Sequence, residues 1–333
     1  IDSLRERRVM SLRTRLGNLG NILDEDESQC HLLQLETPVL TNAEFAAMQE
    51  YMGDTAATID CTFPTKGGEN ALKDALHRIR VEAEDAVRRG ATHIILSDED
   101  MSAERAPIPM ILATGAVHTY LIRQSLRTFT SLNVRSGECM DVQYFAVLIA
   151  CGATTVNAYL AQEAIADRQA RGLFGDMSLS ECLKRYKKGI DDGLLKVMSK
   201  MGISIISSYR GGCNFEAVGL SRALVAEYLP GCTSRLSGIG LAGIMRKVLD
   251  QHDKAFDEEV IALPVGGFYR YRRGGERHAW EGGLIHTLQA AVTKDSYHTY
   301  KKYAQQQHER PPTNLRDLGR IVKQVAIYIF IYY

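Results

Sequence analysis

Short apolar runs alternate with longer amphipathic stretches between residues 54 and 207. Apolar residues recur three and four positions apart over residues 70–89, and Gly90 follows them. This spacing predicts a helix that ends at the glycine. The short apolar runs predict buried strands at residues 55–63, 93–96, 132–134, 155–157 and 203–206.

Further helices are predicted between these strands. Pro107 and Pro109 suit the first turn of a helix that runs to about residue 127, and residues 141–150 form another. Ser178 and Glu181 form a capping-box pattern before a long helix that reaches residue 201. Strands joined by helices need crossover connections, so the sheet is predicted to be largely parallel. The fold class is therefore α/β with a βα-repeat sheet, either an incomplete barrel or a doubly wound sheet.

The pattern changes after residue 220. Helices are predicted at 221–229, 241–252, 283–292 and 295–307, and a hairpin is predicted to pair residues 268–272 with 276–280. We therefore divide the chain into a helical and linker segment (1–53), a central βα-repeat domain (54–264), a helical and hairpin connection (265–318) and an apolar tail of unknown origin (319–333).

Composition excludes several classes of partner. Lys plus Arg and Asp plus Glu both number 40, so the formal net charge is zero and no basic field attracts nucleic acid or an anionic membrane. The apolar run 321–333 is shorter than the roughly 20 residues that cross a bilayer. The seven cysteines are odd in number and none has CxxC spacing, which favours free thiols in a reducing cytoplasm. The start at Ile1, without Met or a signal peptide, suggests a piece of a longer polypeptide.

Polar residues follow three of the predicted strands, and we expect them to meet at one edge of the sheet. They could form a ligand pocket in which the arginines bind carboxylates. The alternative, which we favour, is that Asp98 and Ser136 cap loops while Arg210 anchors a neighbouring domain, because no nucleophile has a base beside it. The candidate residues are Asp98, Arg135, Ser136, Glu138, Ser207, Ser208, Tyr209 and Arg210.

A glycine-rich run at residues 238–243 satisfies the GxGxxG pattern, with Glu258 and Glu259 near the offset of a ribose-binding acid. A dinucleotide loop must follow a strand, and the residues before this run are not a convincing strand. The favoured interpretation is a helix start whose small residues permit close packing. His118, within a predicted helix, is interpreted as structural rather than as a metal ligand.

Several ordered motifs resemble the central region of the glutamate synthase large subunit, and the likeness extends from residue 1 to about 318. The motifs are 36–42 (ETPVLTN), 94–98 (IILSD), 106–109 (APIP), 136–138 (SGE), 157–161 (NAYLA), 200–217 and 263–267 (LPVGG). That family makes glutamate from glutamine and 2-oxoglutarate. An amidotransferase domain with an amino-terminal cysteine releases ammonia. A tunnel carries the ammonia to an FMN-binding (β/α)8 domain, which receives electrons through an iron–sulfur cluster.

The resemblance implies a non-catalytic central domain that links the two sites and supports the tunnel, with residues 265–318 leading into the synthase domain. It implies that FMN and the cluster are bound elsewhere in the polypeptide, and that a reductase subunit or ferredoxin is a possible partner. Ser207, Ser208, Tyr209, Arg210 and Glu216 become candidates for the domain interface or tunnel, together with Asp98, Ser136 and Glu138. The alternative is a stand-alone α/β domain that binds a small molecule or a dinucleotide.

The chain departs from the family at a few of these places. Glu99-Asp100 replaces Arg-Gly, and Cys213 occupies a Gln or Gly position. A carboxylate in place of a cation reverses the charge at a strand end, which argues against an anion-binding role there.

Overall fold

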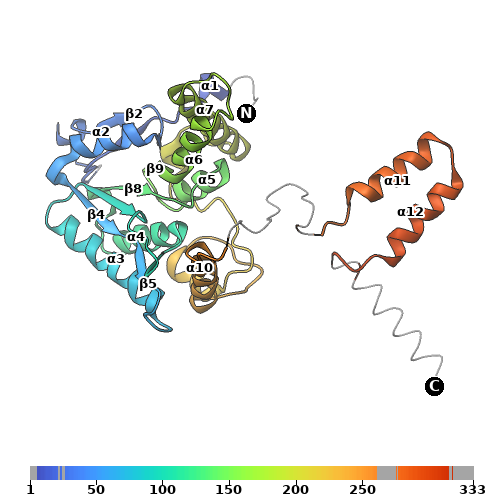
Figure 1. The fold of residues 1–333 in the computed structure, drawn as a ribbon. Coiled ribbons are helices and arrows are strands. Elements are labelled where there is room, and N and C mark those ends of the chain that lie inside the picture. The colour runs from blue at the N-terminus through green and yellow to red at the C-terminus, as the bar shows by residue number, and fades with distance from the viewer. Residues whose placement is uncertain are drawn as a thin grey trace. The chain divides into compact units, whose positions relative to one another are not determined.

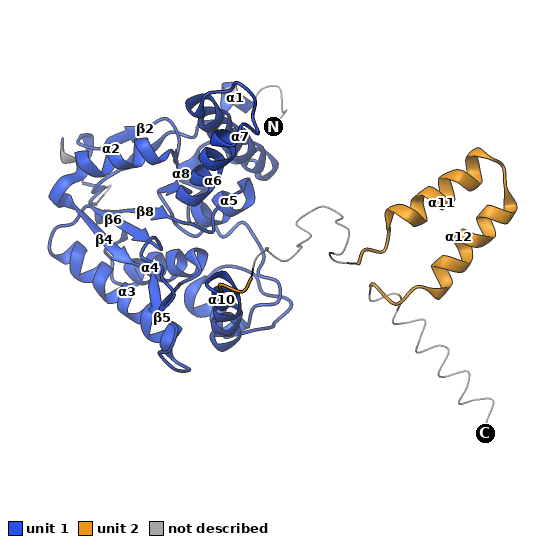
Figure 2. Cartoon of the chain, in the orientation of Figure 1, with its two compact units in different colours: residues 1–257 blue, residues 258–333 orange. Residues whose placement is uncertain are grey.

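The computed structural model describes residues 6–21, 23–24, 27–260, 275, 277–314 and 317. The chain divides into two compact units, residues 1–257 and 258–333, which Figure 2 distinguishes by colour. These are units of packing, and the functional boundaries given above stay predictions.

Unit 1 is built on a five-stranded parallel sheet with the strand order β3-β9-β8-β6-β4 (Figure 1). The strands are β3 (Val39–Leu40), β4 (Ala56–Asp60), β6 (His93–Ser97), β8 (Ser131–Arg135) and β9 (Thr155–Asn157). The predicted α/β class and parallel sheet are confirmed. Of the two architectures left open, the described residues form an open sheet and no closed barrel.

One face of this sheet is apolar and is covered by α3 (Ala71–Arg88), α4 (Met110–Arg123) and α5 (Val142–Ala150). Ile94 and Leu96 of β6 and Leu132 and Val134 of β8 point into this layer and are fully buried. Burying each such side chain contributes roughly 1.5–3 kcal/mol. The helices follow the apolar periodicity, so their positions agree with the sequence.

The opposite face is covered by α2 (Asn42–Met52) and by the hairpin of β1 (Thr14–Leu16) with β2 (Leu33–Leu35). Ile95 packs there against Phe45, Met48 and Met52. The remainder of this face carries polar side chains that bond to each other; for example, Thr155 Oγ1 donates to Asn133 Oδ1 at 2.7 Å. Through α2 the chain passes from edge strand β3 to the opposite edge strand β4.

Helix ends follow the capping signals in the sequence. At α2, Thr41 and Glu44 form a capping box. At α7 (Leu179–Met201), the Ser178 side chain accepts the Glu181 N–H, and Gly202 ends the helix at φ +75°. The helix α6 (Tyr159–Ala170) joins β9 to this segment.

The strand predicted at residues 203–206 is wrong. After α7 the backbone forms a single parallel bridge, Ser11 with Ile205, and then the short helix α8 (Ile206–Tyr209). A four-residue apolar run is compatible with either a strand or a buried helix segment. Here Ile206 enters the core while Ile205 stays exposed.

The single strand predicted at residues 55–63 is two strands. Cys61 separates β4 from β5 (Thr62–Pro64), which pairs with β7 (Arg105–Pro107) in a separate antiparallel sheet. The remaining elements of unit 1 are α1 (Glu6–Val9), η1 (Glu27–Cys30), η2 (Gly53–Thr55), η3 (Arg127–Phe129), α9 (Arg222–Tyr228) and α10 (Leu241–Ala255).

Unit 2 contains two packed helices, α11 (Gly282–Thr293) and α12 (Tyr297–Glu309). Both were predicted. Most of the hairpin predicted at 268–280 lies outside the described residues, and so does the predicted tail at 319–333. Within the described part of the chain, no helix is both long and apolar enough to span a membrane.

Candidate functional site

The carboxyl edge of the sheet buries a carboxylate, Asp98, directly after β6. The residue is 1% exposed, and its two oxygens accept the Gly137 N–H at 2.9 and 3.0 Å. The Tyr159 hydroxyl also bonds to it. Loss of hydration raises the Asp98 pKa to about 7, although these hydrogen bonds oppose the rise. Asp98 therefore fastens the β6 loop to the β8 loop, as the capping interpretation predicts.

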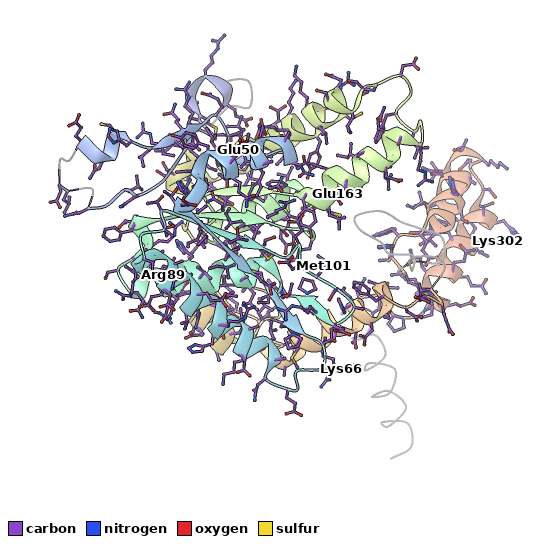
Figure 3. The ribbon with its side chains drawn as sticks, turned by 60° about the vertical axis from the view of Figure 1, so that its left-hand side comes forward. Glu50, Lys66, Arg89, Met101, Glu163 and Lys302 are labelled. Carbon is purple, nitrogen blue, oxygen red and sulfur yellow. The ribbon has the colours of Figure 1, made fainter. Side chains whose placement is uncertain are left out.

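Close packing around Gly137 holds this pair of loops together. A Cβ at Gly137 would lie 2.9 Å from the Tyr159 hydroxyl and 3.3 Å from the methyl carbon of Met101. Met101, which Figure 3 labels, lies in the turn after β6. The glycine is thus needed for the approach of the two loops.

Glu138, the other candidate carboxylate at this edge, caps a helix. Its Oε1 accepts the N–H of Met110, the first residue of α4, at 2.5 Å, and the Tyr144 hydroxyl bonds to it. A carboxylate at this position also interacts favourably with the helix dipole. The residue as a whole is exposed, but its carboxylate serves an internal contact.

Arg135 is occupied by internal partners. Its Nη2 forms an ion pair with Glu99 Oε1 at 2.7 Å, and its guanidinium lies over the rings of Phe45 and Tyr159 at 5.3 and 5.4 Å. The carboxylate that reverses the family's charge therefore neutralises Arg135. This arrangement does not favour capture of a ligand carboxylate by Arg135.

Three buried polar atoms at this edge have no hydrogen-bond partner in the structure: Arg135 Nε, Ser136 Oγ and Asn157 Oδ1. The backbone of Ser136 donates to the Asn157 carbonyl at 3.0 Å, but its hydroxyl caps nothing. The expected capping role of Asp98 is thus seen, whereas that of the Ser136 side chain is not.

The loop after α8 lies at the opposite, amino edge of the sheet, away from Asp98 and Glu138. Arg210 Nη2 donates to Thr14 Oγ1 at 2.5 Å, and Thr14 Oγ1 donates to the carbonyl of Thr154, which immediately precedes β9. Gly211 N–H donates to Ile149 at the end of α5. The expectation that all three polar loops meet at one edge of the sheet is therefore wrong, because residues 203–206 do not form a strand of this sheet.

Within this loop the candidates have different environments. Tyr209 is 2% exposed and belongs to the main core, so its ring is not a surface contact. Ser207 and Ser208 are exposed. Arg210 is half-buried, and its Nε has no hydrogen-bond partner.

The structure identifies a further residue at the amino edge, Arg127, which the sequence analysis missed. Its guanidinium donates to His118 Nδ1 at 2.9 Å, to the Thr130 carbonyl at 2.6 Å and to the Gly152 carbonyl at 2.9 Å. Burial and then the charge of Arg210 lower the Arg127 pKa to about 9. No periodicity marks Arg127, which begins the three-residue element η3, so only its position beside the loops before β8 and β9 identifies it.

His118 is structural, as predicted. Its Nδ1 accepts from Arg127 and must be unprotonated, which places the ring proton on Nε2. Burial, followed by the charges of Arg127 and Arg210, lowers its pKa to about 3. The imidazole is therefore neutral at physiological pH.

Glu216 lies apart from both edge clusters. It is exposed, bridges to Thr233 through the backbone, and pairs with Arg235 at 3.5 Å in a solvated contact. Such a pair contributes little to stability.

The glycine run at 238–243 forms the start of α10. Ile239 makes one bridge to Leu220, and no strand precedes the helix among the described residues. A Cβ at Gly238 would lie 2.0 Å from the Gly219 carbonyl oxygen, so the two backbones approach closely there. These contacts favour the packing interpretation over a dinucleotide loop.

The described residues contain no group of three His, Cys, Asp or Glu side chains arranged to hold a metal ion. The seven cysteines are free thiols in this structure. The expectation that FMN and the iron–sulfur cluster are bound by other parts of the polypeptide stays a prediction.

Comparison with known proteins gives a consistent result. A family model described as the glutamate synthase central domain matches residues 1–221. The chain is similar to the glutamate synthase (NADPH) large chain of Azospirillum brasilense, with 73% identity over 318 residues, covering 96% of this chain and 21% of that protein. The corresponding chain of Bacillus subtilis is 39% identical over 321 residues, again covering 96% and 21%.

A third relative, the chloroplastic ferredoxin-dependent glutamate synthase of Spinacia oleracea, is 36% identical over 333 residues, covering 96% of this chain and 20% of that protein. The chain therefore spans about a fifth of the length of these relatives.

Proposed function

This chain belongs to the glutamate synthase central-domain family, and on that premise we propose that it is a non-catalytic central domain. In the parent enzyme it would link the glutamine amidotransferase site to the flavin-bearing synthase site and support the passage of ammonia between them. The parent reaction would be the synthesis of glutamate from glutamine and 2-oxoglutarate.

The observation that carries this proposal is the internal use of the carboxyl edge, where open α/β enzymes place their chemistry. Asp98 joins two loops, Glu138 caps α4 and Arg135 pairs with Glu99. Among the described residues of this edge, each charged candidate is thus held by a partner from the same chain. An edge whose charged side chains are held by internal partners is better suited to a structural role than to substrate binding.

The amino-edge loop is the better candidate for a surface that faces another domain. Ser207 and Ser208 are exposed, and the adjoining Arg210 is half-buried and has no ion-pair partner among the described residues, so its guanidinium can donate to an acceptor from a neighbouring domain. A charge-assisted hydrogen bond of this kind is directional, and its loss would loosen the alignment of the two catalytic domains.

The partners we propose are the amidotransferase and FMN-binding domains of the same polypeptide, with a reductase subunit or ferredoxin as electron donor. FMN and the iron–sulfur cluster would belong to those other parts. We place the enzyme in the cytoplasm, because the free thiols suit a reducing compartment.

The test introduces Arg210→Ala into the complete glutamate synthase and measures glutamine consumed against glutamate formed. The matched control is Arg168→Ala, at an exposed arginine on α6. We expect Arg210→Ala to hydrolyse glutamine in excess of glutamate formation, by about twofold or more, and Arg168→Ala to stay coupled. Unchanged coupling in Arg210→Ala would refute the role of this loop.

A second experiment tests the absence of a ligand site. Calorimetry of the full chain with 2-oxoglutarate, glutamate, FMN and NAD is expected to give no binding heat. Tight, stoichiometric binding of any of these would replace the architectural proposal with that of a small-molecule domain.

A further inference from the structure

Two cysteines meet at a cavity of about 210 Å³ that is lined by residues of α4 and by the turns after α8 and α9. Cys213 lies in the turn after α8 and Cys232 in the turn after α9. Both are partly exposed, whereas the neighbouring Cys151 is buried. The cavity gives a small reagent access to the first two sulfurs.

The side chains of Cys213 and Cys232 line the same cavity and interact electrostatically. Cys213 Sγ also donates to the Pro230 carbonyl at 3.3 Å. At Gly231, where φ is +91°, a Cβ would lie 3.1 Å from the same sulfur, so the glycine lets the second turn close onto Cys213. The backbone of Cys213 itself has φ +50°, an uncommon conformation for a residue other than glycine. The two turns therefore converge at the sulfur of Cys213.

From this geometry we propose that Cys213 and Cys232 form a reversible intramolecular disulfide when a low-molecular-weight disulfide such as oxidised glutathione is present. The bond would join the turn that follows Ser207–Arg210 to the turn that follows α9. Cys151, the third cysteine that lines the cavity, is buried and is therefore the less accessible partner for Cys213.

The exchange proceeds in two balanced steps. The Cys213 thiolate attacks one sulfur of oxidised glutathione, forms a mixed disulfide and releases one glutathione thiolate. The Cys232 thiolate then attacks the Cys213 sulfur, forms the protein disulfide and releases the second glutathione. The two protons lost by the cysteines go to the two glutathione thiolates, so the protein is oxidised by two electrons and oxidised glutathione is reduced.

The order of attack follows from the environment of the two thiols. Burial raises the pKa of Cys232 to about 12, with the contact to Cys213 adding to the rise. Burial also raises the pKa of Cys151. Since the thiolate is the nucleophile, these two groups are slow to react with a reagent in solution. Cys213 therefore reacts first, and Cys232 reacts only after the mixed disulfide has formed beside it.

The experiment equilibrates the full chain in glutathione buffers of increasing oxidised fraction, blocks remaining thiols and maps disulfides by peptide mass spectrometry. We expect a Cys213–Cys232 link in monomeric protein, reversed by reduced glutathione. Closing a loop of about 20 residues should also raise the Tm by roughly 5–10 °C. Cys213→Ser and Cys232→Ser should each lose the link and the Tm rise, while Cys30→Ser, at an exposed cysteine elsewhere, should keep both.

Each possible outcome of this experiment either supports or contradicts the proposal. A Cys213–Cys232 peptide that appears and disappears with the buffer supports the proposal. Glutathione retained on Cys213, a link from Cys213 to Cys151, or intermolecular dimers through Cys30 alone would each overturn it. Near-ultraviolet circular dichroism of the reduced variants verifies that they are folded, so that a missing link reports on chemistry.

Discussion

The two edges of the central sheet carry ionisable side chains of opposite type. At the carboxyl edge the carboxylates of Asp98 and Glu138 accept hydrogen bonds from the backbone of neighbouring loops. At the amino edge, burial and then the nearby charge of Arg210 lower the pKa of Arg127. Neither arginine has an ion pair with a carboxylate of the described residues.

The two edges also differ in how far their charges are paired within the chain. The carboxyl edge balances its exposed charges internally, as in the pairs of Arg135 with Glu99 and Arg105 with Asp60. The amino edge gathers positive charge that its own chain does not neutralise, and like charges in a partly desolvated site are unfavourable. We therefore expect the carboxyl edge to determine stability and the amino edge to respond to neighbouring domains.

The largest effect that tests this comparison is a pH dependence from Asp98. The unfolded chain ionises this group near pH 4, whereas the folded chain holds the proton to about pH 7. The unfolded state binds fewer protons in this window, so stability falls as pH rises through it. We expect Asp98 to lower the free energy of unfolding by up to about 4 kcal/mol between pH 4 and 7.

Urea unfolding at several pH values measures this dependence. Asp98→Asn should flatten the slope relative to the parent chain, while Asp100→Asn, at an exposed neighbour, should leave it unchanged. Equal slopes in the parent and Asp98→Asn would mean that Asp98 is already ionised in the folded protein.

At the amino edge, Arg127→Ala should destabilise the fold by about 3 kcal/mol, because it leaves the carbonyls of Thr130 and Gly152 without their donor. Arg123→Ala is the matched control, since that arginine forms a solvated pair with Glu227 at 3.4 Å. Its expected cost is below about 1 kcal/mol. Similar urea midpoints for both variants would contradict a structural role for Arg127.

The smallest expected effect concerns the charge at position 99. Glu99→Gln removes the partner of Arg135 in a pair that is partly exposed, so we expect a loss of about 0.5 kcal/mol that shrinks at high salt. Asp167→Asn, in the more exposed pair with Arg171, should cost less. A stability gain in Glu99→Gln would show that this carboxylate is unfavourable at the strand end.

The sequence by itself determined the positions of most of the helices and strands that form the layers of unit 1. Apolar spacing located α3, α4 and α5, and the buried runs located β6, β8 and β9, because one face of each element must leave water. Capping residues fixed the start of α7 and its end at Gly202. Ordered motifs identified the family, and the charge balance gave no support for nucleic-acid partners.

Only the tertiary structure decided how the polar loops are grouped. The loop of Ser207–Arg210 was expected beside Asp98, yet it lies near Thr14 and Arg127, because residues 203–206 make a single bridge rather than a sheet strand. Local periodicity records which side of an element is buried, but not the neighbour that buries it. Arg127, the Cys213–Cys232 contact and the split between two edges all depend on long-range packing, so no local pattern specifies them.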